Sequence, residues 1–173
     1  MTRRNNSRVA GFTFLLYIVA GISSMALKNR DPDNGLLVLL TLLTSLCALT
    51  LGVTLYALTR SQDPDLALLA LTCRIIEAIP GEDGAIFFSV GSTIFAWLLL
   101  RGRMVPGVLG WLGVLASVLL VVVLPLQRAG AMGGPGSWAS MLTWGIWFPM
   151  LIFEIWLAIY LIVRGAAEPG PAA

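Results

Sequence analysis

Residues 36–58 read LLVLLTLLTSLCALTLGVTLYAL, a run of 23 residues without a charged side chain or a proline. As an α-helix this run is about 34 Å long, which is enough to cross the hydrocarbon core of a bilayer, about 30 Å thick. The whole composition agrees, because 58% of the 173 residues are hydrophobic and 12% are charged, with a mean hydropathy of +0.88. A soluble domain carries about 25% charged residues. The sequence therefore predicts a membrane-embedded protein.

Further apolar runs lie on both sides of this one, and together they predict an all-α, polytopic membrane helix bundle with six hydrophobic segments. We expect one transmembrane domain over residues 1–173, with helices near 9–27, 36–58, 64–79, 85–100, 105–126 and 141–163. The first run follows three arginines, as in a signal peptide, but it is long enough to span the bilayer. We therefore expect it to remain as an uncleaved first helix.

The third and fourth runs are short. From Pro64 to Ile79 a helix reaches only about 24 Å, less than the hydrocarbon core. Asp63 and Pro64 are typical of a helix start, and the sequence PGEDG at residues 80–84 predicts a break before the fourth run. Two arrangements fit this pattern: two short spanning helices surrounded by protein, or a re-entrant hairpin that returns to its own side.

Basic residues outside the expected helices favour one orientation. Seven lie on the side of the N-terminus: Arg3, Arg4, Arg8, Arg60, Arg101, Arg103 and Arg164. Three lie on the other side: Lys28, Arg30 and Arg128. Loops rich in Lys and Arg stay on the cytoplasmic side of a membrane. We therefore expect a multi-pass protein of the cell (plasma) membrane with both termini in the cytoplasm.

The composition also argues against several classes of function. A net charge of +2 offers no basic surface for nucleic acid, and the absence of histidine removes the commonest metal ligand and general base. Cys47 and Cys73 both lie inside apolar runs, where a thiol usually acts as a small hydrophobe. No nucleophile motif is recognisable either. We expect no enzyme activity, no metal and no cofactor.

Three ionisable residues lie within apolar sequence: Arg74, Glu77 and Glu154. Counted from the nearest helix end on the N-terminal side, Arg74 and Glu154 both lie about 15 Å deep. Glu77 lies one helical turn from Arg74 on the same face. A charge at this depth costs about 2.5–3.5 kcal/mol on insertion scales, so such groups usually pair inside the bundle. The sequence predicts a cluster in which Arg74 meets Glu154.

Two interpretations of this cluster are open. Two carboxylates that share one guanidinium leave one negative charge in a medium of low dielectric constant, so the cluster could take up a proton or line a path for a small solute or lipid. In the other interpretation the three residues only fasten the third helix to the sixth.

Pro149 and three glycines add two expectations about helix shape. Pro149 lies five residues before Glu154 and removes a hydrogen bond to the carbonyl of Gly145, which predicts a kink. Gly107, Gly110 and Gly113 recur every three residues and give a flat strip for close helix approach. This strip serves either packing within the bundle or contact with a second copy in an oligomer.

Four segments together resemble a known family. They are RVAGFTFLLYIVAGI (8–22), CRIIEA (73–78), FFSVGSTIFAWLLLRGRMVPGVLGWLGVLAS (87–117) and FPMLIFEIWLAIYLIVRG (148–165). The combination is similar to the bacterial integral-membrane proteins grouped as domain-of-unknown-function family 4386. The resemblance implies a six-helix membrane protein in which Arg74, Glu77, Pro106, Pro149 and Glu154 are family features, and it implies no activity. This chain is shorter than the family pattern between Ile79 and Gly84.

Two functions therefore remain from the sequence. The first is a membrane protein that binds or translocates a small solute, lipid or proton at the cluster of Arg74, Glu77 and Glu154. The alternative is a non-catalytic structural or partner-binding subunit in which these residues only clasp helices. The lipid bilayer is the one partner that either function requires.

Overall fold

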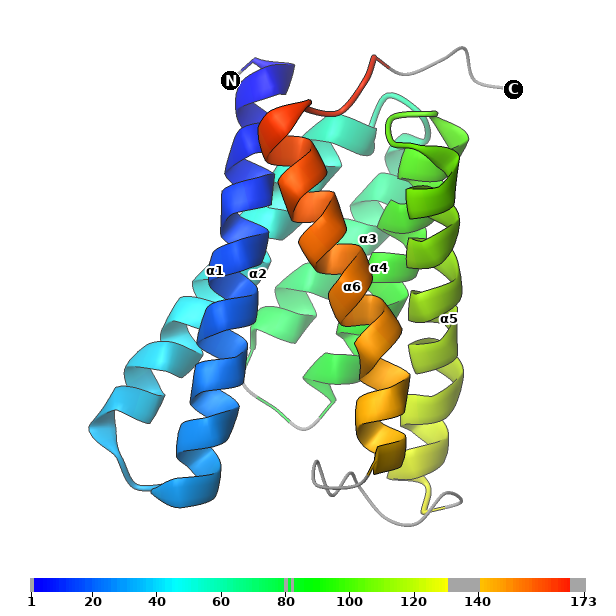
Figure 1. Cartoon of the computed structure of the whole chain (residues 1–173). Helices are drawn as coiled ribbons and strands as arrows, with labels where there is room; N and C mark the ends of the chain where they lie inside the picture. The colour runs from blue at the N-terminus through cyan, green and yellow to red at the C-terminus, as the bar shows by residue number, and fades with distance from the viewer. Residues whose placement is uncertain (1, 80, 82, 131–140, 169–173) are drawn as a thin grey trace.

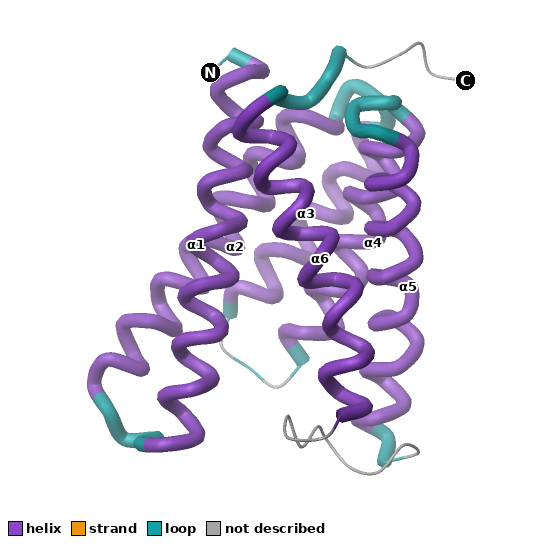
Figure 2. The backbone as a smooth tube through the Cα atoms, viewed as in Figure 1, coloured by secondary structure: helices purple, strands orange, loops and turns teal. Residues whose placement is uncertain are grey.

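The computed structural model describes residues 2–79, 81, 83–130 and 141–168, of which residues 141–144 are described by their backbone alone. In this part of the chain it contains helices and no strand, so the expected all-α fold is confirmed (Figure 2). The helices are α1 (Arg3–Arg30), α2 (Gly35–Thr59), α3 (Pro64–Ala78), α4 (Gly84–Arg101), α5 (Gly107–Arg128) and α6 (Met141–Val163). Consecutive helices run in opposite directions, and both ends of the chain lie at the same end of the bundle (Figure 1).

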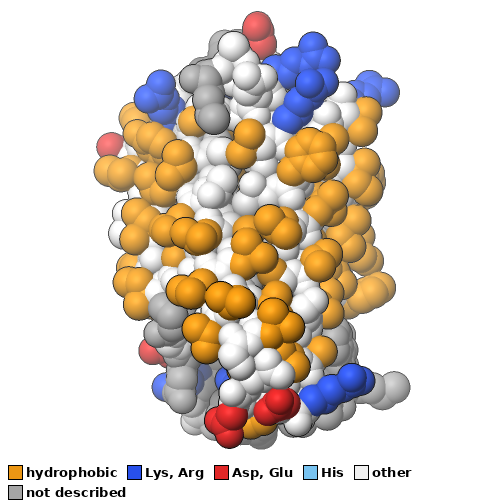
Figure 3. Space-filling model, turned by 90° about the vertical axis from the view of Figure 1, so that its left-hand side faces the viewer, with side chains coloured by type: hydrophobic (Ala, Val, Ile, Leu, Met, Phe, Trp, Pro, Cys, Tyr) orange, Lys and Arg blue, Asp and Glu red, His pale blue; other side chains and the backbone are white. Residues whose placement is uncertain are grey.

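The helices carry the signature of a membrane-embedded bundle. Within the described residues, five helices are long and apolar enough to cross a membrane, namely α1, α2, α4, α5 and the Gly145–Val163 part of α6. Large apolar side chains face outward, as Val108 and Leu115 do at 71% and 64% exposure. On the face drawn in Figure 3, hydrophobic side chains form a broad belt, and charged side chains gather at its two ends. Such a surface is stable in lipid and not in water.

α3 is the exception, because its 15 residues span only about 22 Å. It begins where expected: the side chain of Asp63 accepts a hydrogen bond from the backbone N–H of Leu66 at 3.0 Å, and Pro64 occupies the first turn. α4 begins toward the far end of the bundle, because Asp83 lies 3.3 Å from the guanidinium of Arg128 at the end of α5. The α3–α4 pair therefore runs along the bundle toward the end opposite the chain termini.

The glycine strip of α5 packs inside the bundle. A Cβ at Gly110 would lie 2.8 Å from Leu100 of α4, and one at Gly113 would overlap the ring of Phe153 of α6. Gly107 has nothing within 4 Å of such an atom. Two of the three glycines thus let neighbouring helices approach, and only Gly107 is open to a second copy.

A short segment after α6 closes the end of the bundle where the termini lie. The Arg3 guanidinium donates to the carbonyls of Leu58 at 3.3 Å and Ala167 at 2.9 Å. The N–H of Ala167 donates in turn to the carbonyl of Met104 at 3.0 Å, in the turn between α4 and α5. The segment thereby links α1, α2 and the α4–α5 turn across this end.

Candidate intramembrane polar site

The centre of the site is an ion pair within α3. Arg74 Nη1 donates to Glu77 Oε2 at 2.9 Å and to Oε1 at 3.2 Å. The two residues lie three positions apart, so the helix itself places them on one face. Their side chains are only 1% and 7% exposed. The expectation that Arg74 and Glu77 would pair is confirmed.

The Arg74 side chain packs against two glycines, one on each neighbouring helix. A Cβ at Gly52 of α2 would lie 2.9 Å from the Cβ of Arg74, and a Cβ at Gly91 of α4 would lie 3.8 Å from its Cγ. Gly91 would also meet Cys73 at 3.1 Å. Small residues at these positions let α2 and α4 approach α3 closely on both sides. The aliphatic part of Arg74 is thereby enclosed by backbone.

Two hydroxyl groups connect this pair to other helices. Tyr17 of α1 donates to Glu77 Oε1 at 2.6 Å, and Arg74 Nη2 donates to Ser92 Oγ of α4 at 3.1 Å. Hydrogen bonds to charged groups are shorter and stronger than those between neutral groups. The network therefore joins the side chains of α1, α3 and α4.

An aromatic group lies against the guanidinium. The Arg74 Cζ lies 4.8 Å from the centroid of the Phe88 ring, a cation–π distance. Phe88 stacks on Tyr17 with centroids 6.3 Å apart, and it meets Trp147 of α6 at 5.7 Å. These rings exclude water from one side of the ion pair and bring α6 beside it.

Glu154 is buried near this network without joining it. The residue is 5% exposed, and its Oε1 is buried without a hydrogen-bond partner. The expected contact between Arg74 and Glu154 was wrong: among the described residues, the ion pair of Arg74 within 4.0 Å is the one with Glu77.

The side chains of α6 that line the cavity beside Arg74 are apolar. Met150, Phe153 and Leu157 of this helix are 1–3% exposed and belong to the main hydrophobic core. Met150 and Leu157 lie one turn before and after Glu154, so Glu154 shares this buried face although it does not line the cavity. Pro149 lies inside α6, which continues as a helix through it. The expected kink remains a prediction that rests on the missing N–H.

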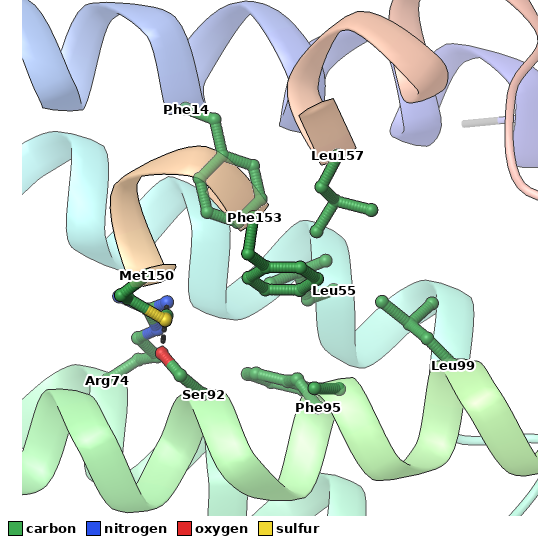
Figure 4. A pocket seen from close by; sticks show the side chains of 10 residues that line it. Phe14, Leu55, Arg74, Ser92, Phe95, Leu99, Met150, Phe153 and Leu157 are labelled. Carbon is green, nitrogen blue, oxygen red and sulfur yellow. Dashed lines mark hydrogen bonds between the residues drawn. The ribbon is translucent and has the colours of Figure 1, made fainter. Parts of the chain in front are cut away.

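A small cavity adjoins the guanidinium (Figure 4). It offers about 10 Å³ to the centres of water molecules, close to the least space that holds one water. Arg74 and Ser92 supply its polar lining, and the apolar lining includes Phe14, Met150 and Phe153. Arg74 Nε is buried without a hydrogen-bond partner. A single water molecule is the largest ligand that this cavity admits.

Sequence reasoning missed the residues that complete the network, which are Tyr17, Gly52, Phe88, Gly91 and Ser92. Each is a common residue of apolar helices, so none stands out from its neighbours. A hydroxyl or a glycine at the depth of an intramembrane charge is the signal that would have pointed to them. Within the described residues, no three acidic or cysteine side chains come close enough to hold a metal ion.

The comparisons with known proteins agree with the membrane assignment and add no activity. Residues 83–165 match the model of the family described as "Domain of unknown function (DUF4386)", which confirms the resemblance inferred from the sequence. The matched range contains Ser92, Pro149 and Glu154 and ends at Gly165, before Ala167, whose hydrogen bonds cap the bundle. No curated protein matches the chain, and no solved structure does.

Proposed function

We propose that this membrane protein, whose residues 83–165 match the model of the DUF4386 family, takes up and releases a proton at Glu154. The observation that carries the proposal is the buried Oε1 of Glu154, which has no hydrogen-bond partner in the described part of the chain. Buried polar atoms almost always have partners, so an exception inside a membrane is a functional candidate.

The charges around Glu154 support a proton as the ligand. Arg74 and Glu77 already form a hydrogen-bonded pair, and their charges cancel. Tyr17 is neutral and directs its hydroxyl to Glu77. An ionised Glu154 would therefore add an uncompensated negative charge in a medium of low dielectric constant. A proton on Glu154 removes that charge.

The size of the cavity argues against larger ligands. The cavity beside Arg74, which Glu154 does not line, offers about 10 Å³, so of the solute, lipid or proton considered from the sequence only a proton, alone or with one water molecule, fits there. A solute or lipid would require the helices around Arg74 to separate, and the network of Tyr17, Glu77 and Ser92 opposes such a movement.

The second candidate is a structural role, and one observation favours it. The bonds of Arg74, Glu77, Tyr17 and Ser92 join three helices and leave both charges paired. In this interpretation the protein is a non-catalytic subunit, and Glu154 takes no part in its function. The two candidates differ in what happens when Glu154 alone is changed.

Infrared difference spectroscopy on the full chain in lipid separates the two candidates. We expect a pH step to produce a carbonyl band of a protonated carboxylic acid in the wild type, because Glu154 gains or loses its proton. This band disappears in Glu154→Gln and remains in Glu168→Gln, whose side chain is exposed in the segment after α6. If no band depends on Glu154, the result contradicts proton uptake there and supports the structural role.

The setting of the protein is part of the same proposal. The excess of arginine at the end of the bundle that holds both termini supports a plasma-membrane protein with cytoplasmic termini. We propose no catalysis and no cofactor, and the bilayer is the partner that its surface requires. Contact with a second copy through Gly107 also belongs to this proposal, since nothing lies within 4 Å of a Cβ at that position.

A further inference from the structure

α1 and α2 extend well beyond the end of α3. On α1, Gly21, Ser24 and Lys28 follow Tyr17 at helical spacing, so they continue the face that binds Glu77 of α3. On α2, Leu37 and Thr41 share a face with Gly52, which packs on Arg74 of α3. These continuations face the place that α3 would fill if it did not end at Ala78.

The two faces form a groove at this place. It has a volume of about 370 Å³ and is lined by Gly21, Ser24, Met25, Lys28, Leu37 and Thr41. The far half of the hairpin has little other protein against it, because no α1 residue after Ala20 and no α2 residue before Cys47 is buried. Figure 1 shows this half leaning away from the other helices. Lipid is the solvent at this level of the molecule.

Lys28 lies at the mouth of the groove and is free to bind an anion. Within the described residues its ammonium group has no ion pair within 4.0 Å. Asp31, the nearest acidic residue in the chain, accepts instead from the side-chain amide of Asn34 at 3.1 Å. Deeper in the groove, the hydroxyls of Ser24 and Thr41 donate to the carbonyls of their own helices. The interior thus offers carbon atoms from Met25 and Leu37 and no further free charge.

We propose that one phospholipid with a net negative headgroup binds in this groove, with its phosphate on Lys28 and an acyl chain along Gly21, Met25 and Leu37. The chain occupies the space left by the short α3, and the headgroup stays at the end of the bundle opposite the termini. The arrangement combines a lysine that reaches the interface with an apolar path beneath it. This binding does not depend on the proton site at Glu154.

Two variants and one control test the site in the purified full chain. Lys28→Gln removes the cation, and Gly21→Leu fills the groove, where a Cβ at residue 21 meets nothing within 4 Å. Arg30→Gln is the matched control, because it removes an exposed cation from the same turn that does not line the groove. Native mass spectrometry in a non-ionic detergent counts retained dioleoyl phosphatidylglycerol, with dioleoyl phosphatidylcholine as the neutral lipid.

We expect the wild type and Arg30→Gln to retain one phosphatidylglycerol. Lys28→Gln should retain it about tenfold more weakly, as for the loss of one charge-assisted hydrogen bond, and Gly21→Leu should exclude it. Equal retention by Lys28→Gln and Arg30→Gln would overturn the proposal, as would equal retention of the two lipids by the wild type. Thermal stabilisation by inorganic phosphate that equals stabilisation by phosphatidylglycerol would also overturn it, because an anion without a chain would then suffice.

Discussion

Tyr17 of α1 and Glu77 of α3 are 60 residues apart in the chain and share a hydrogen bond of 2.6 Å inside the bundle. The carboxylate also binds Arg74, so Glu77 receives donors from two helices at once. This bond is the direct polar link between the first helix and the ion pair. It holds the Tyr17 hydroxyl toward α3.

Tyr17→Phe removes this bond and keeps the ring that stacks on Phe88. We expect a loss of about 1 kcal/mol in the free energy of unfolding, which is the scale of interhelical hydrogen bonds in membranes. Equilibrium unfolding in mixed detergent measures the change. Tyr160→Phe is the control, because the Tyr160 hydroxyl has no hydrogen bond among the described residues; equal losses in the two variants would show that Tyr17 contributes through its ring alone.

Arg74→Met leaves Glu77 as a buried charge without its guanidinium. Breaking a buried ion pair from one side costs about 3–5 kcal/mol, so we expect this variant to unfold or to give little protein. The double variant Arg74→Met with Glu77→Gln should recover much of this loss, because no charge is left unpaired. Asp83→Asn is the control. It breaks the ion pair of Arg128 and Asp83, whose side chains are 47% and 59% exposed, and it should lower the free energy of unfolding by less than about 1 kcal/mol. A double variant no more stable than Arg74→Met would contradict this account.

The sequence predicts the helices and the Arg74–Glu77 pair for a physical reason. Long apolar runs must be helical in lipid, and residues three apart on a helix must be neighbours. Depth along a helix can also be counted, which is why Arg74 and Glu154 were placed at one level. The side chains that meet between two helices cannot be counted in this way. Met150, Phe153 and Leu157 of α6 line the cavity beside Arg74, and among the described residues the ion pair of Arg74 is with Glu77.

The contact between α1 and α6 depends on a glycine. A Cβ at Gly11 would lie 2.7 Å from the carbonyl oxygen of Ala158, and a backbone atom cannot move aside as a side chain can. We expect Gly11→Ala to cost about 1–3 kcal/mol by overpacking. Gly21→Ala, on the same helix with nothing near its Cβ, should be neutral or stabilising. Thermal unfolding without added lipid compares the two, and equal losses would refute the close approach.

The orientation of the bundle can be read with single cysteines. The native Cys47 and Cys73 are 4% and 5% exposed, so a membrane-impermeant maleimide should label the wild type weakly. In intact bacterial cells we expect Asp83→Cys to be labelled from outside, and Glu168→Cys to be labelled only after the membrane is opened. Labelling of both variants from the same side would mean that α3 and α4 return without crossing.

Glu154 and Glu77 should respond in opposite ways to the same substitution. Glu77→Leu removes the partner of a buried guanidinium and the acceptor of Tyr17, so it should lower the free energy of unfolding by about 3 kcal/mol or more. Glu154→Leu replaces a carboxyl whose buried oxygen has no partner, and it should leave stability unchanged or raise it. Functional sites often hold residues that lower stability, so a Glu154→Leu variant that is as stable as the wild type or more stable would support a functional role for Glu154. Equilibrium unfolding of both variants in one detergent makes the comparison, and a large loss in Glu154→Leu would reveal that Glu154 fastens the bundle as Glu77 does.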